Sequence, residues 1–263
     1  MRRQQNLQAS LLIALCLISA SGFLWPFFVA SYNASDKASW FFFIAAPLTV
    51  IALIYSINLN PLDSKTIAIL AVLTAVIAAF RPFGAGAIGI EPMWFILILA
   101  ARVFGPYFGF ILGATSMLLS AILTGGIGPW LSYQVFAAAG IGVGLAIIPS
   151  KLRGRSEVFA LAIYAIVACE SFGIAMDLQF WPWSLGRGTQ LSYIPGAPLA
   201  TNVAHFFTYH FTASMAWDIP RAIFTSILIL VAAPAVLNTL RRAYVKAAFN
   251  PEVKFVKKDL TNV

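Results

Sequence analysis

A series of long apolar runs is the feature that most constrains how this chain can fold. Of its residues, 60 % are apolar and 10 % are charged, and the mean hydropathy is +0.87. A helix needs about 20 apolar residues to cross a bilayer, and several runs approach this length. The sequence therefore predicts an all-α polytopic membrane protein, because helices satisfy their own backbone hydrogen bonds in lipid. The eight predicted spans cover residues 8–31, 40–58, 66–80, 93–104, 107–124, 130–149, 157–178 and 210–238.

The stretch from Arg81 to Trp130 contains a helical hairpin with a glycine-rich loop on each side. The tight turn Gly105-Pro106 joins its two apolar segments. Proline and glycine interrupt helices, so we expect both flanking loops to be irregular. Irregular backbone beside apolar helices usually lines a cavity, since unpaired amide groups cannot face lipid. We therefore expect a cavity at this end of the hairpin.

Lysine and arginine are distributed unevenly between the predicted loops. With eight spans and a cytoplasmic N-terminus, thirteen of the 17 Lys and Arg residues lie on the inside. Cytoplasmic loops carry such an excess, which predicts a multi-pass plasma-membrane protein with both termini cytoplasmic. The pI of about 9.7 then needs no nucleic-acid partner. The first run follows Arg2 and Arg3 but lacks a clear cleavage site, and we interpret it as a retained helix, not a signal peptide.

Ionisable residues within the last two predicted spans need an explanation, because a charge costs about 3 kcal/mol at the membrane centre. Glu170 and Asp177 are seven residues apart and share a helical face. In the last span, polar and aromatic residues recur at spacings of three and four around Pro220. Two interpretations stay open: Asp218, Arg221 and Glu170 neutralise one another structurally, or they line a site. The stripe on the last span comprises His210, Ser214, Trp217, Asp218 and Arg221.

A long predicted loop joins these two spans on the outside. It runs from about 177 to 209 and contains Trp181 and Trp183. A loop of this length is often functional, for instance as a lid over a site. The alternative is that both tryptophans belong to the ordinary aromatic belt at the membrane interface.

No motif for catalysis or cofactor binding is found. The sequence contains no HExxH motif, no Gly-x-Ser-x-Gly motif and no Walker-type loop. Its histidines, His205 and His210, are five residues apart and do not share a helical face as metal ligands would. We therefore predict no enzyme activity, no cofactor and no metal site.

Small residues at four-residue spacing mark the predicted span 66–80. Ala71, Ala75 and Ala79 form one stripe, which lets another helix approach closely. The stripe contacts either a partner protein or a neighbouring helix of the same bundle. Ala138, Gly142 and Ala146 form a similar stripe, which we interpret as internal packing.

Five stretches of the chain carry a family resemblance. They read RPFGAGAIGIEPMWFILILAARVFGPYFGFILGA, LTGGIGPW, IIPSKLRGR, LQFWPW and SMAWDIPRAIFTSILIL. Together they resemble the substrate-binding S component of energy-coupling factor (ECF) vitamin transporters, in an actinobacterial-type subgroup. The resemblance implies a six-helix bundle with an outward-facing vitamin pocket. It also implies a coupling transmembrane subunit and two ABC-type ATPases as partners, with docking through Ala71, Ala75 and Ala79.

The predicted organisation departs from a minimal S component at its N-terminus. We expect an extra transmembrane hairpin over 1–63, the S-component-like bundle over 64–245 and a cytoplasmic tail over 246–263. The resemblance implies a substrate-specificity subunit of an ECF-type importer, with cobalamin or a related corrinoid as the first candidate ligand. A stand-alone ion-coupled transporter using Glu170, Asp218 and Arg221 is the alternative, and a non-transporting scaffold is a third. The expected substrate-binding residues are Arg81, Glu91, Trp94, Trp130, Gln134, Glu170, Asp177, Trp181, Trp183, His210, Trp217, Asp218 and Arg221.

Overall fold

The regular structure of the described chain is helical. The computed structural model describes residues 22–28, 64–85, 89–128, 130–185 and 188–247. Within these ranges there is no strand, and five helices are long and apolar enough to cross a membrane. The predicted span 40–58, and most of the span 8–31 and of the C-terminal tail, lie outside the described residues. The fold is thus that of an all-α membrane protein.

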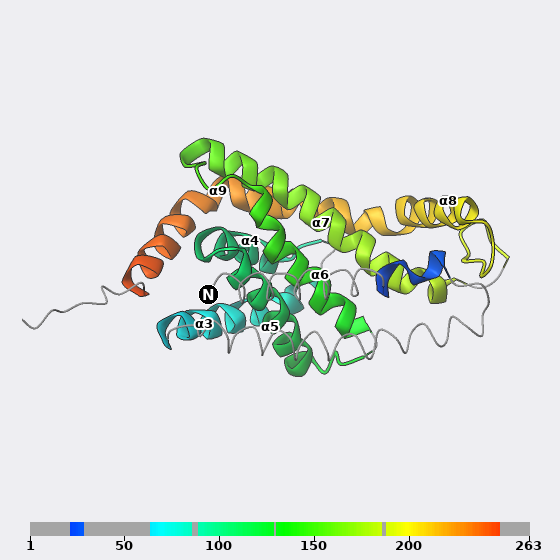
Figure 1. Ribbon diagram of the computed structural model, residues 1–263, viewed down its shortest axis with the longest axis horizontal. Helices are drawn as coiled ribbons and strands as arrows, with labels where there is room; N and C mark the ends of the chain where they lie inside the picture. The colour runs from blue at the N-terminus through cyan, green and yellow to red at the C-terminus, as the bar shows by residue number, and fades with distance from the viewer. Residues whose placement is uncertain (1–21, 29–63, 86–88, 129, 186–187, 248–263) are drawn as a thin grey trace, which may run out of the picture.

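A helix occupies each of the six segments predicted between residues 66 and 238. Three of these helices are bordered by short 3₁₀ or π segments (Figure 1). The elements are η1 (Trp25–Phe27), α3 (Ser64–Phe80), η2 (Arg81–Ala85), α4 (Pro92–Phe104), α5 (Pro106–Thr124), α6 (Trp130–Gly144), η3 (Leu145–Ile147), α7 (Gly154–Ser184), α8 (Leu199–Tyr209), the π segment η4 (His210–Ser214) and α9 (Met215–Ala247).

Helix α4 lies at the centre of the bundle. It has only 13 residues, eight of them buried, and it contacts α3, α5, α6, α7 and α9. Because its neighbours cover it, α4 does not need the length of a helix that faces lipid. Gly105, with φ of 98°, ends α4, and Pro106 starts α5, so the predicted tight turn is confirmed.

The contact between α5 and α6 depends on residues without large side chains. A Cβ atom on Gly109 would meet the backbone of Gly142, and one on Gly113 would meet the backbone of Ala138. The internal packing predicted for Ala138 and Gly142 is therefore confirmed, whereas Ala146 is exposed. Close backbone approach of this kind is a main source of helix association in lipid.

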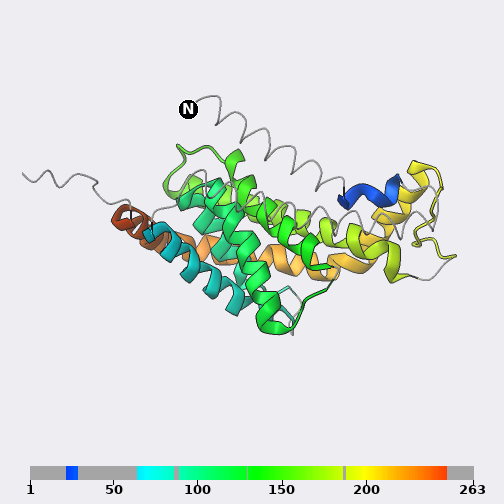
Figure 2. The same cartoon turned by 60° about the horizontal axis from the view of Figure 1, so that its bottom comes forward.

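Helices α7 and α9 lie side by side along the bundle (Figures 1 and 2). The prediction of a loop over 177–209 is wrong for most of its length. Helix α7 continues to Ser184, and α8 begins at Leu199 and runs through η4 into α9. Only residues 185–198 connect the two helices.

Aromatic packing accounts for these longer helices. Trp181 is fully buried on α7, with ring centroids 5.4 Å from both Tyr193 and Phe206, and its Nε1 donates to the carbonyl of Leu191 at 2.6 Å. Phe27 of the N-terminal segment packs against the same cluster, 6.0 Å from the Trp181 ring. These contacts hold the extension of α7 together with α8 and η1.

At the opposite end of the bundle, one carboxylate joins three elements. Glu157 of α7 pairs with Arg102 of α4 at 2.8 Å and with Arg241 of α9 at 2.6 Å. Arg102 also donates to the carbonyl groups of Pro149 and Leu152. The cluster ties the ends of α4, α7 and α9 to the loop between α6 and α7.

Candidate functional site

A cavity of about 470 Å³ lies at the end of the bundle remote from Glu157. Its walls come from η2, α4, α5, α6, α7 and α9. It therefore lies at the end of the α4–α5 hairpin where the sequence predicts one. Its lining includes seven of the predicted binding residues, namely Arg81, Glu91, Trp94, Trp130, Gln134, Trp217 and Arg221.

Two other hollows, of about 670 and 760 Å³, lie near the end of the bundle that contains Glu157. They are larger, but neither brings together aromatic rings and charged groups from several helices. One is formed by α7 and α9 and the other by α9 alone. A specific ligand site needs a few polar groups that converge inside an apolar wall. We therefore take the cavity beside Arg81 as the candidate site.

Arg81 brings a positive charge to the wall of this cavity. Its guanidinium donates to Ser120 Oγ at 3.3 Å and to Gln134 Oε1 at 2.6 Å. Both partners are neutral, and Arg81 forms no ion pair with any carboxylate of the described residues. The side chain is thus oriented by hydrogen bonds while its charge stays available to a ligand.

Arg221 is the second arginine of the cavity, and it is held by two carboxylates. Its Nη1 lies 2.5 Å from Asp218 Oδ1, and its Nε lies 3.1 Å from Glu91 Oε1. Glu91 Oε2 accepts a hydrogen bond from Trp94 Nε1 at 2.5 Å. The expected pairing of Asp218 with Arg221 is confirmed. The structural alternative also paired Glu170 with Arg221, but Glu91 from the loop before α4 occupies that position.

The loop before α4 reaches α9 because it contains a glycine at the contact. Gly89 has φ of 73°, and a Cβ atom there would collide with Pro220 and with the backbone nitrogen of Arg221. Only glycine combines this backbone conformation with this close approach. The contact places Glu91 within reach of the Arg221 guanidinium.

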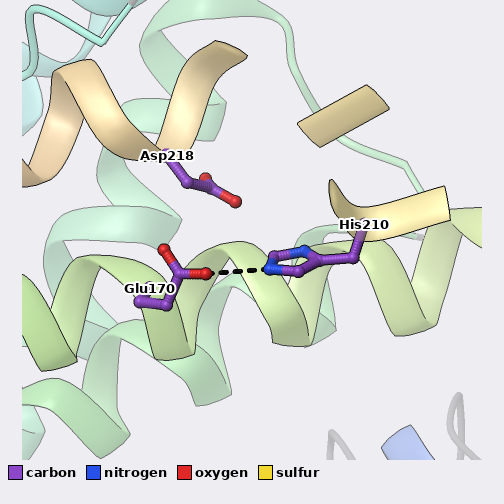
Figure 3. A group of neighbouring side chains, drawn as sticks. All are labelled: Glu170, His210 and Asp218. Carbon is purple, nitrogen blue, oxygen red and sulfur yellow. Dashed lines mark hydrogen bonds and ion pairs between the residues drawn. The ribbon is translucent and has the colours of Figure 1, made fainter. Parts of the chain in front are cut away.

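A second polar network lies beside the cavity, between α7 and the start of the last helix. His210 Nδ1 lies 2.6 Å from Asp177 Oδ2, and its Nε2 lies 2.8 Å from Glu170 Oε1. Asp177 Oδ1 accepts a hydrogen bond from Ser214 at 2.6 Å. Figure 3 shows His210 pointing from its helix toward Glu170, with Asp218 nearby. The predicted face shared by Glu170 and Asp177 is confirmed by their common contact with His210.

The two tryptophans predicted for the outer loop do not reach the cavity. Trp181 is enclosed in the aromatic cluster of α7 and α8, and Trp183 is half exposed against Trp25. Neither tryptophan therefore lines this cavity. Other lining residues were not predicted, and Ser120 and Thr124 could have been recognised, because they are polar residues four apart in an apolar span. The unpredicted lining residues include Met93, Met117, Ser120, Thr124, Phe172 and Met176.

Comparisons with protein-family models, with curated proteins and with solved structures find no match for this chain.

Proposed function

We propose that this protein is the membrane-embedded substrate-binding subunit of an ECF-type importer, and that it binds a vitamin or related micronutrient. The observation that carries the proposal is the cavity at one end of an apolar bundle, where aromatic rings and two arginines converge. The sequence resemblance to S components supports the same function. The coupling subunit and the two ATPases are proposed partners, because the chain has no phosphate-binding loop of its own.

The lining of the cavity favours a ligand with a flat ring and an anionic group. Trp94, Trp130, Trp217 and Phe172 provide apolar faces for a ring. Arg81 offers a guanidinium that forms no ion pair within the described residues, and arginine binds carboxylate and phosphate groups with paired hydrogen bonds. Ser120 and Gln134 hold the guanidinium in position for such a group.

The volume of the cavity favours a small vitamin over a corrinoid. About 470 Å³ lies in the range of roughly 300–1,000 Å³ that holds drug-sized ligands. A corrinoid macrocycle with its nucleotide is much larger than such ligands. A small vitamin is therefore the first candidate ligand and cobalamin the second. Cobalamin would fit only if the cavity opened further.

Native mass spectrometry of the purified protein, followed by titration with the ligand it releases, tests this function. We expect one small anionic molecule per chain. Arg81→Gln should weaken its binding about tenfold to a hundredfold, since a hydrogen bond to a charged group contributes about 1.5–3 kcal/mol. Arg155→Gln is the matched control, because Arg155 is exposed at the opposite end of the bundle. Equal affinity of both variants would contradict the assignment of Arg81 to the site.

A stand-alone ion-coupled transporter is the second candidate function. It is favoured by the connected contacts of Asp177, His210 and Glu170, since ionisable groups inside a membrane often carry ions. Proteoliposomes that contain only this protein separate the two functions. Uptake of the ligand driven by an ion gradient would support the alternative, whereas uptake that requires the coupling subunit, the ATPases and ATP would support the importer.

A further inference from the structure

We propose that Glu170, His210 and Asp218 bind a divalent transition-metal ion, with Asp177 orienting the histidine. This site goes beyond the vitamin-binding function and does not depend on it. The three residues come from α7, η4 and α9, and their potential ligand atoms all lie within 4.8 Å of one another. Sequence spacing alone predicts no metal site, because the two histidines of the chain do not act together.

The geometry is close to that of an occupied site. Bonds of about 2.0–2.2 Å to nitrogen and oxygen place the ligands of a tetrahedral ion about 3.4 Å apart. The pair of His210 Nε2 and Glu170 Oε1, now 2.8 Å apart, has to widen slightly, and Asp218 has to approach. Figure 3 shows the Asp218 carboxylate directed toward the space beside Glu170 and His210.

The contacts of His210 leave its Nε2 atom facing a carboxylate oxygen, where a positive charge is favourable. Asp177 as a carboxylate can only accept, so the Nδ1 atom of His210 carries the proton of that 2.6 Å contact. In the neutral imidazole, Nε2 is then an acceptor, yet it faces the acceptor Oε1 of Glu170. At 2.8 Å this contact needs a positive centre, which a second proton on the imidazole supplies, or a metal ion at Nε2 once the two atoms have moved apart. A carboxylate that accepts from Nδ1 is the usual outer partner of a metal-bound histidine.

Asp218 provides a second and independent indication. Its side chain is 3 % exposed, and its Oδ2 atom has no hydrogen-bond partner in the described part of the chain. A buried carboxylate oxygen without a partner is costly, and a bound cation would remove that cost.

The balance of charge around the two networks also favours a cation. Among the residues that the structure describes, four carboxylates, of Glu91, Glu170, Asp177 and Asp218, form ion pairs with only two basic side chains, those of Arg221 and His210. Even a protonated histidine leaves an excess of negative charge among these contacts. A divalent ion at Nε2 would compensate for this excess.

The ligand set selects the class of ion. One imidazole and two carboxylates suit Zn²⁺ and its first-row neighbours better than Mg²⁺ or Ca²⁺, which take oxygen ligands almost exclusively. Glu170 has a side-chain exposure of 31 %, so an ion can reach the site from the surface. A water molecule would complete the four-coordinate shell.

Zinc titration of tag-free protein, purified in detergent and stripped with a chelator, tests the proposal. We expect one Zn²⁺ per chain by elemental analysis, and Co²⁺ in its place should give the visible absorption of a four-coordinate ion. His210→Gln, Glu170→Gln and Asp218→Asn should each weaken binding more than tenfold. Asp177→Asn should retain the stoichiometry and weaken binding about 10–100-fold, as outer-shell changes do.

His205→Gln is the matched control, because the His205 ring contacts the backbone carbonyl of Ser192 and lies outside the cluster. Its affinity for Zn²⁺ should equal that of the unchanged protein. The proposal is overturned if the unchanged protein binds no Zn²⁺, or if folded variants of the three ligands bind as it does. If the variants do not fold, the Co²⁺ spectrum of the unchanged protein decides, since a purely six-coordinate or absent signal contradicts the site.

Discussion

At the scale of single residues, the candidate site depends on where side chains are missing as much as on where they are present. Gly173 lies on α7 between Glu170 and Asp177, and a Cβ atom at this position would overlap the carboxylate of Asp218. The missing side chain lets α9 bring Asp218 against α7. The position of this carboxylate, which contacts Arg221, therefore depends on a glycine that contributes no chemistry itself.

Gly173→Ala should consequently destabilise the protein. The added methyl group forces Asp218 away from Arg221, and overpacking of this kind costs about 1–3 kcal/mol. Thermal unfolding of the detergent-solubilised protein, followed by tryptophan fluorescence, would show a lower midpoint. Gly140→Ala is the control, because a Cβ atom there has nothing within 4 Å, and alanine favours a helix. Equal midpoints for both variants would contradict this account of the contact.

Residue spacing predicted one of the two ion pairs of Arg221 and could not predict the other. Asp218 and Arg221 are three apart, so helix geometry alone places them together. Glu91 is 130 positions from Arg221, and only the folded loop brings the two into contact. The double replacement of Asp218 and Arg221 by leucine would therefore leave Glu91 without its ion pair, and a charge-free variant has to include Glu91→Gln.

At the scale of elements, apolar runs located the helices well and their ends poorly. The six runs between 66 and 238 coincide with helices because lipid requires internally bonded backbone. The sequence pattern did not predict the last turns of α7 or helix α8, because residues 177–209 combine prolines, polar residues and tryptophans without a clear period. Their helical structure depends on contacts with η1, which no local pattern reveals.

Helix α3 presents its alanine stripe on the surface of the described bundle. Ala71, Ala75 and Ala79 are all exposed, and none contributes to the buried core of the described residues. Packing within this part of the chain therefore does not explain the stripe. We propose that a coupling subunit docks on this stripe, since small residues allow close approach of a partner helix.

Ala75→Leu should weaken association with the coupling subunit about tenfold or more while ligand affinity is unchanged. The larger side chain fills the space that a partner helix needs. Co-purification of the importer complex and ligand titration of the isolated protein measure the two effects separately. Val72→Leu is the control, because Val72 is exposed on α3 and already has a branched side chain, so leucine adds little volume there. Loss of ligand binding with the complex intact would show that the stripe serves the bundle itself.

At the scale of the whole molecule, the two ends of the bundle differ in chemistry. One end contains Glu157 with its three arginine partners, and the other contains the cavity and the connection after α7. With 31 residues, α7 is about 46 Å long, which exceeds the hydrocarbon core of about 30 Å. Its ends therefore extend beyond the core of the bilayer. We propose that the Glu157 end faces the cytoplasm, because the excess of basic residues predicts that side for it.

This orientation predicts which introduced cysteines can be labelled from outside intact cells. Gln190 is exposed in the connection between α7 and α8, and Ser150 is exposed in the loop between α6 and α7. In a Cys16→Ser background, where the remaining Cys169 is buried, a membrane-impermeant maleimide should label Gln190→Cys in intact cells. It should label Ser150→Cys only after the cells are opened. Gln190 is preferable to Gly188, whose φ of 91° disfavours any larger residue. Labelling of both cysteines in intact cells would contradict the predicted topology. Labelling of Ser150→Cys alone would show that the protein has the opposite orientation. The cavity would then lie on the cytoplasmic side, where it could not capture a nutrient from outside.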